Sequence, residues 1–315
     1  MHAPLPSTLG PEDSIAAAGS AACADPSADA FADTRIGFLL QLAGKLTAEN
    51  AERVARTQSE LGLRFGDAAM RLGLVNQEDI DAVIARQFAY PVVARGTSTF
   101  SPRLVAAFHP ASPQGDTLRA VRSQLLLRWF GTGRHALAIS GVGTGDASSV
   151  LAANLALVFA QLGQRTLLVD ANLRHGVQHA LFGLHGQPGC CAERSSSGLS
   201  NVLAGRAGLD AILRVPGFDA LSLLAAGTVP PNPHELLERA SFGALHAQLG
   251  KLYDVVLYDI APASHGAEAV AVAAHAGAAL LVAQKDHTPV ALLKRLAQQM
   301  AAAQVAVIGS VLVEA

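Results

Sequence analysis

Residue types that suit a nucleotide phosphate gather in one short stretch of the chain. Gly141, Gly143 and Gly145 follow a short apolar run and precede a helix that opens at Ser148 and Ser149. A strand that turns through glycines into a helix points backbone N–H groups and the positive helix end at one spot. This stretch therefore predicts a phosphate-binding loop.

Two carboxylates are expected beside that loop. Asp170 ends the apolar run that begins at Leu167, and Asp259 ends the run 253–259. Ligands of parallel α/β sheets bind beyond the carboxyl ends of the strands, where both aspartates fall. Carboxylate and hydroxyl oxygens are magnesium ligands, so Asp170 and Ser149 predict a magnesium ion on the bound phosphate.

The phosphate loop has no lysine. Its standard form ends in Gly-Lys-Ser/Thr, and these positions fall on Ala147, Ser148 and Ser149. A hydrogen bond to a charged group contributes about 1.5–3 kcal/mol, so we expect weakened nucleotide binding and a larger loss in phosphoryl transfer. The alternative is a glycine turn in an α/β domain that binds no nucleotide. The candidate nucleotide-binding residues are Gly143, Gly145, Ala147, Ser148 and Ser149.

Apolar runs and helical patterns alternate from Ala136 onward, which favours a parallel sheet covered by helices on both faces. We expect an α/β, P-loop NTPase-like domain over 114–315, preceded by a small helical-repeat domain. The expected strands are 136–140, 166–170, 220–225, 253–259, 278–283 and 305–313. The expected helices are 148–162, 175–182, 234–249, 267–275 and 289–302.

Composition excludes several classes of protein. The 315 residues carry a net charge of −2, so no general electrostatic grip on nucleic acid is expected. No apolar run reaches membrane-spanning length, and the first residues do not form a secretory signal. Three cysteines do not make a disulfide framework, and a reducing compartment fits. A set of histidines and cysteines fits no strong metal spacing: His175, His179, His185, Cys190 and Cys191.

An internal repeat precedes the predicted α/β domain. Arg35-Ile36-Gly37 recurs 29 residues later as Arg64-Phe65-Gly66, and Gly44 recurs as Gly73. Each unit predicts a helix, a glycine turn and a second helix. We assign residues 1–32 to a disordered tail, 33–95 to the helical-repeat domain, and the proline-rich stretch 96–113 to a linker.

The spacing of this repeat resembles the N-terminal domain of type II secretion and pilus assembly ATPases. Some domains of that family bind cyclic di-GMP through two such motifs, which implies Arg35 and Arg64 as guanine or phosphate contacts. Arginines on glycine turns are chemically suitable for this. The alternative is a helical docking module with surface arginines.

From about Asp116 to the end, four motifs resemble the bacterial tyrosine kinases of exopolysaccharide assembly, a group related to the MinD- and ParA-type ATPases. Asp116-x-x-Arg119-x-x-Arg122 resembles their subunit-contact helix. The other three motifs are LLVDANLR from Leu167, PPNPHELL from Pro230 and YDVVLYDIAP from Tyr253. Together with the helical repeat, the chain is similar to the EpsG-type chain-length-determinant tyrosine kinases.

The resemblance implies roles for particular residues. ATP and Mg²⁺ would lie between the loop and the aspartates, with Ser149 and Asp259 at magnesium positions. Asp170 would be linked to magnesium and would activate a tyrosine hydroxyl. Asn172 stands where the family has a second catalytic aspartate. Assembly into a homo-oligomer would use Asp116, Arg119 and Arg122.

The departures from the family decide the predicted function. Lysine is replaced by Ser148, and the chain ends without a tyrosine cluster, its tyrosines being Tyr90, Tyr253 and Tyr258. We therefore expect a cytoplasmic, kinase-derived regulator, held at the inner membrane by a chain-length-determinant (polysaccharide co-polymerase) protein. The alternatives are an active kinase or ATPase in which another cation, from Arg134 or from a neighbouring subunit, replaces the lysine, and a cyclic di-GMP-binding adaptor.

Overall fold

The computed structural model describes residues 36–77, 79–81, 83, 91–93, 98–143, 145–184, 197–262 and 268–314. The chain divides into two compact units, Met1–Asn76 and Gln77–Ala315. No helix within the described ranges is long and apolar enough to cross a membrane.

The N-terminal unit has the helix–turn–helix form that the repeat predicts. A helix over 36–42 is followed by α2 (Ala48–Leu61) and α3 (Phe65–Arg71). Gly44 and Gly73, which are equivalent in the repeat, both have left-handed backbones with φ of 68° and 67°. Glycine adopts this conformation without a steric cost, which explains why both repeats carry it at the end of a helix.

Gly37, another glycine of the first repeat unit, has a packing role. A Cβ atom on Gly37 would lie 2.9 Å from the ring of Phe65, which is buried in the same unit. The first glycine of the Arg-apolar-Gly motif therefore lets α3 approach the first helix. This is a structural reason for the motif that requires no ligand.

The C-terminal unit is built on a seven-stranded sheet of order β3-β4-β2-β5-β1-β6-β7, in which only β3 pairs antiparallel. This confirms the expected α/β class with a mostly parallel sheet. The strands are β1 (Ala136–Gly141), β2 (Thr166–Asp170), β3 (Leu213–Arg214), β4 (Leu221–Leu224), β5 (Val255–Asp259), β6 (Ala278–Gln284) and β7 (Ala306–Val313).

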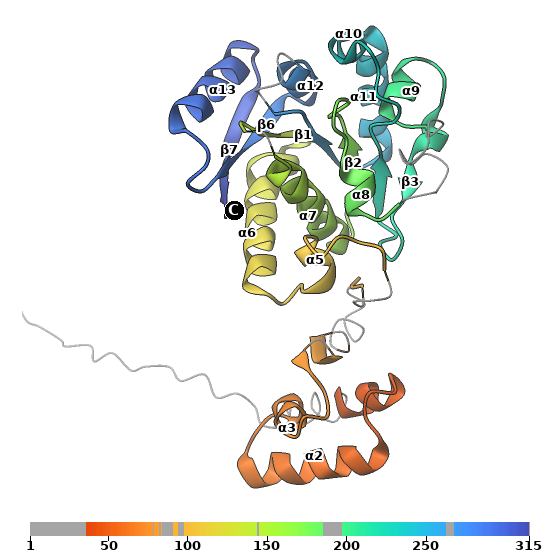
Figure 1. Cartoon of the computed structure of the whole chain (residues 1–315), viewed down its shortest axis with the longest axis vertical. Helices are drawn as coiled ribbons and strands as arrows, with labels where there is room; N and C mark the ends of the chain where they lie inside the picture. The colour runs from red at the N-terminus through yellow and green to blue at the C-terminus, as the bar shows by residue number, and fades with distance from the viewer. Residues whose placement is uncertain are drawn as a thin grey trace, which may run out of the picture. The chain divides into compact units, whose positions relative to one another are not determined.

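Helices cover both faces of the sheet, and each face has its own apolar core (Figure 1). One core includes α5 (Val105–Phe108), α6 (Pro113–Arg128) and α7 (Ala147–Gln161). The other core is formed with α9 (Leu199–Leu203), α10 (Pro233–Glu238), α11 (Ala240–Leu252), α12 (Glu268–Ala276) and α13 (Val290–Ala302). Alternate residues of the central strands β1, β2, β5 and β6 enter opposite cores, so these strands are buried on both sides.

Two predicted helices differ from the structure. The helix expected over 234–249 is two helices, α10 and α11, because Arg239 between them has an extended backbone with ψ of 147°. The helix expected over 175–182 contracts to α8 (Gln178–Leu181). The residues before α8 instead form a loop over β2, where a Cβ atom on Gly176 would meet the Cβ atom of Ala226 at 2.5 Å.

The proline-rich stretch that the sequence assigns to a linker packs into the C-terminal unit. Phe100 and Leu104 are buried in the core that α7 shares. The buried amide of Asn154 on α7 fixes this segment, accepting from Ala106 N at 3.0 Å and donating to the carbonyl oxygen of Arg103 at 3.0 Å. Residues 98–108 are therefore part of the α/β unit.

We expect Asn154→Ala to lower the free energy of unfolding by about 1–3 kcal/mol, because it leaves the buried N–H of Ala106 and the part-buried carbonyl oxygen of Arg103 without their partner. Urea denaturation of the full chain measures this. The matched control is Gln299→Ala, which removes an exposed amide from α13 and should change stability by less than about 0.5 kcal/mol. Equal losses in the two variants would contradict the anchoring role of Asn154.

Candidate functional site

Two aspartates lie side by side at the ends of neighbouring strands. Asp170 of β2 and Asp259 of β5 are partners in the parallel register, and both side chains are fully buried. β5 also pairs with β1, where Ile139 is the partner of Asp259, and the glycine loop follows directly after β1. The register therefore brings both carboxylates to the sheet edge at which the loop begins.

Gln178, at the start of α8, holds both carboxylates. Its backbone N–H donates to Asp170 Oδ2 at 3.0 Å, and its side-chain Nε2 donates to Asp259 Oδ2 at 2.7 Å. The same Nε2 donates to the carbonyl oxygen of Ser149 at 2.9 Å. One buried residue thus orients the two aspartates and ties them to the first turn of α7.

The other oxygen of each carboxylate has no hydrogen bond. Asp170 Oδ1, Asp259 Oδ1 and Gln178 Oε1 are buried and unpaired among the described residues. Burial raises the pKa of Asp170 well above its ordinary value, and the neighbouring Asp259 raises it further. Burial also raises the pKa of Asp259 to about 6, against hydrogen bonds from Gln178 and Ser149 that lower it. Buried oxygens without partners are costly, so the site favours a ligand there.

The glycine loop faces these carboxylates. Gly145 has φ of 149°, α7 begins at Ala147, and Ser148 and Ser149 are buried in its first turn. A cavity of about 430 Å³ opens between the loop and β2. Its lining includes Gly145, Asp146, Ser149, Asn172, His175, Val177 and Pro262.

These residues fit a magnesium ion. Mg²⁺ is a hard cation that takes oxygen ligands and binds through one or two carboxylates together with substrate phosphates. The unpaired Asp170 Oδ1 and Asp259 Oδ1 supply such ligands, and the Ser149 hydroxyl lies within hydrogen-bonding reach of Asp259. A divalent cation would also offset the repulsion between two adjacent buried carboxylates.

The loop position that lacks lysine offers only a hydroxyl. Ser148 is 3% exposed, and a Cβ atom on Gly141 would lie 3.2 Å from Ser148 Oγ, so the side chain turns in toward β1. The expected substitute, Arg134, is misplaced: its guanidinium stacks 4.5 Å above the ring of Trp129, before the first residue of β1. It lies at the opposite end of that strand from the loop, so it cannot replace the lysine.

An arginine that the sequence did not single out reaches the loop instead. The Arg103 guanidinium forms a two-point ion pair with Asp146, the residue that precedes α7, and the Nη2–Oδ1 distance is 2.7 Å. This pairing lowers the pKa of Asp146. Neither Arg103 nor Gln178 carried a motif signal, because each acts through a fold contact rather than a residue spacing.

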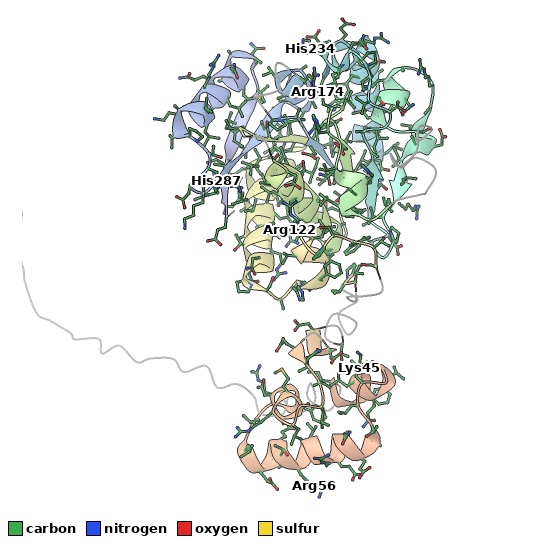
Figure 2. All side chains as sticks on the ribbon, viewed as in Figure 1. Lys45, Arg56, Arg122, Arg174, His234 and His287 are labelled. Carbon is green, nitrogen blue, oxygen red and sulfur yellow. The ribbon has the colours of Figure 1, made fainter. Side chains whose placement is uncertain are left out.

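The residues expected to contact other subunits have partners within the chain. Asp116 and Arg119 form an ion pair on α6, with Arg119 Nη2 2.6 Å from Asp116 Oδ1. Arg122 Nη1 donates to the carbonyl oxygen of Val158 on α7 at 2.8 Å, between the two helices (Figure 2). These bonds hold α6 in place, and the subunit-contact role stays a prediction.

The remaining candidates belong to the N-terminal unit or lie outside the described residues. Arg64 is an exposed residue at the start of α3, whereas Arg35 lies outside the described residues. His185, Cys190 and Cys191 also lie outside them. Where the structure is described, no group of three or more metal-ligating side chains gathers.

The buried carboxylates predict a pH-dependent stability. Because the pKa of Asp259 is raised in the folded state, the folded protein keeps a proton at pH values where the unfolded protein has lost it. The stability that this proton contributes is therefore greatest below about pH 4 and is lost as the pH rises through about 6. Without Mg²⁺, we expect thermal stability to fall between about pH 4 and pH 7. Asp259→Asn should remove at most about 3 kcal/mol of this fall.

Thermal denaturation across this range measures the effect, with Asp219→Asn, an exposed carboxylate changed to an amide, as the matched control. A pH profile of Asp259→Asn that parallels the unchanged chain would contradict the assignment.

Comparisons with known proteins agree on one family, although no family model matches the chain. The chain is 33% identical over 190 residues to a putative tyrosine-protein kinase in the cps region of Klebsiella pneumoniae, covering 59% of this chain and 25% of that protein. It is 32% identical over 211 residues to the putative tyrosine-protein kinase EpsB of Ralstonia solanacearum, covering 66% and 26%. It thus spans about a quarter of the length of these two relatives.

A solved structure matches over most of its length. The kinase domain of the Escherichia coli tyrosine kinase ETK is 30% identical, with a TM-score of 0.61, and the match covers 69% of this chain and 82% of that domain. The strand order, the glycine loop and the two strand-end aspartates belong to the matching α/β unit. The chain belongs to the bacterial tyrosine kinase family.

Proposed function

We propose that the α/β unit binds ATP with Mg²⁺ weakly and acts as a regulatory, kinase-derived protein of capsule or exopolysaccharide synthesis. The observation that carries the nucleotide site is the pair Asp170 and Asp259, whose Oδ1 atoms have no hydrogen-bond partner and whose strands end at the sheet edge where the glycine loop begins. The reference to polysaccharide rests on relatives whose names place one in a cps region and another as EpsB.

Each residue of the site has a part in holding the nucleotide. The N–H groups at the start of α7 would face the phosphates, and Ser149 with the aspartates would hold the metal. Bound Mg²⁺ supplies positive charge to the phosphate oxygens. Gln178 keeps the two carboxylates oriented, because it occupies their Oδ2 atoms and leaves Oδ1 available.

Ser148, at the position where the family has lysine, supports a regulatory function rather than a catalytic one. Phosphoryl transfer depends on positive groups that stabilise the charge of the transferring oxygens, and Ser148 provides none. Asn172, at the rim of the cavity, keeps a hydrogen-bond acceptor without a charge. Tyr258 is 1% exposed and its hydroxyl lies 2.9 Å from His246 Nδ1, so it is not an accessible phosphate acceptor.

The proposed regulatory protein acts by assembling with other copies of itself and with a membrane partner. The chain would form a homo-oligomer through α6, where Asp116, Arg119 and Arg122 lie on one helix. It would sit at the inner membrane, on its cytoplasmic side, through a membrane chain-length-determinant protein. Nucleotide occupancy would then bias assembly rather than drive a transfer reaction.

An active kinase is the alternative from a different class, and the retained Asp170 and Ser149 favour it. It requires a cation other than lysine at the phosphates. Phosphotyrosine on a partner protein that disappears in Asp170→Asn would establish this alternative and overturn the regulatory one. Binding of cyclic di-GMP by Arg35 and Arg64 stays a prediction from the repeat alone.

Restoring the lysine tests the proposal. We expect Ser148→Lys to tighten binding of ATP with Mg²⁺ by about 10–100-fold, because a charged hydrogen bond contributes about 1.5–3 kcal/mol. Isothermal calorimetry on the full chain measures the affinity. Ser123→Lys, which adds the same charge on the exposed side of α6, should leave it unchanged.

Thermal denaturation of each variant shows whether the buried position tolerates lysine. Should Ser148→Lys unfold, Asp170→Asn gives the second measurement: it should abolish the Mg²⁺ dependence of ATP binding. No ATP binding by any folded variant would overturn the proposed nucleotide site. Tight binding and turnover by the unchanged chain would instead overturn the claim that the site is weakened.

A further inference from the structure

The glycine loop carries an ion pair between Asp146 and Arg103, two residues to which the proposed site gives no other role. Asp146 places a carboxylate at the entry of α7, where a helix attracts anions and where a triphosphate would meet like charge. Arg103 neutralises that carboxylate through both guanidinium Nη atoms. The acid and its arginine therefore belong to the phosphate end of the cavity that Asp146 lines.

Arg103 has a fixed backbone and an accessible head group. Its carbonyl oxygen accepts from Asn154 Nδ2 at 3.0 Å, and Asn154 Oδ1 accepts from Ala106 N, so the segment is pinned to α7. The Arg103 side chain is 49% exposed, and that of Asp146 is 43% exposed. A half-exposed ion pair contributes little to stability because solvent screens it, so this one opens at little cost.

A polyphosphate would compete well for this guanidinium. Arginine binds phosphate oxygens with two parallel hydrogen bonds, and a nucleotide triphosphate with its metal still offers more negative charge than one carboxylate. The long side chain pivots from a fixed Cα, so its head can leave Asp146 while the segment stays in place. No comparable charge comes from Ser148, which is buried and turned toward Gly141.

We propose that Arg103 supplies the positive charge at the nucleotide phosphates that the loop itself lacks, exchanging Asp146 for a phosphate oxygen when nucleotide binds. This inference rests on the proposed nucleotide site and adds a residue and a partner exchange to it. In the absence of nucleotide, the ion pair with Asp146 keeps the Arg103 guanidinium within reach of the loop. The exchange makes Asp146 a competitor of the nucleotide.

The experiment distinguishes direct contact between Arg103 and the nucleotide phosphates from an indirect effect, in which Arg103 only neutralises Asp146. Arg103→Gln is made in the unchanged chain and in Asp146→Asn, and affinities for ATP with Mg²⁺ and for adenosine are measured by calorimetry on the full chain. In the Asp146→Asn background no carboxylate remains to be neutralised. We expect Arg103→Gln there to weaken ATP binding about 10–100-fold and to leave adenosine binding unchanged.

Two further variants control for charge and folding. Arg128→Gln removes an exposed arginine from the end of α6 and should not change ATP affinity. Arg103→Lys keeps a positive charge without the fork of donors, and should retain part of the ATP affinity that Arg103→Gln loses. Thermal denaturation accompanies each variant, because loss of the ion pair alone should cost little stability.

The outcomes distinguish this inference from the proposed function. If Arg103→Gln has no effect in the Asp146→Asn background while Ser148→Lys binds ATP, the nucleotide site stands and the role of Arg103 is overturned. If Arg103→Gln weakens ATP and adenosine equally, the effect is structural and the inference also fails. If no folded variant binds ATP, the proposed function is overturned and this inference with it.

Discussion

Two buried carboxylates in direct register are the constraint around which the rest of the site is arranged. Asp170 and Asp259 stand on adjacent strands, burial opposes the ionisation of both, and Asp259 raises the pKa of Asp170 further. Such a pair is stable only when its oxygens have partners or a cation, since an unpaired buried charge is costly. Gln178 provides half of those partners. The unpaired oxygens belong to residues at the sheet edge where the glycine loop begins, so a cation bound at this edge would give them the partner that they lack.

The parallel sheet explains why the aspartates must meet. β5 lies between β2 and β1, and the three strands are parallel, so their carboxyl ends share one edge of the sheet. The loop that follows β1 therefore begins at the edge where the two aspartates end their strands. The two apolar cores fix the sheet from both sides, with α7 packed across it in one of them. Because α7 is nearly all buried, the position of its first turn is set by core packing and not by the ligand.

The sequence predicts those parts of the site that depend on spacing, and misses those that depend on folding. The strand-end aspartates and the left-handed glycines Gly44 and Gly73 follow from local rules and are found as expected. Gln178 gave no signal, because its role arises only when the loop before α8 closes over β2. Arg103 was placed in a linker because prolines surround it, yet apolar Phe100 and Leu104 in the same stretch pack in the core. Proline marks an irregular backbone, and it does not mark an unpacked one.

In the proposed site, the charges around the cavity would couple binding of the nucleotide to binding of its metal. Without a fixed lysine, the loop presents Asp146 beside its own arginine, and the buried pair lies beyond it, so a free triphosphate would meet acids at both ends. A divalent cation shared between the carboxylates and the phosphates removes the larger part of this repulsion. If both bind as proposed, each ligand would raise the affinity for the other, and by linkage the two effects would be equal in free energy. A site with this charge pattern would respond to metal and nucleotide jointly, as the proposed regulatory function requires.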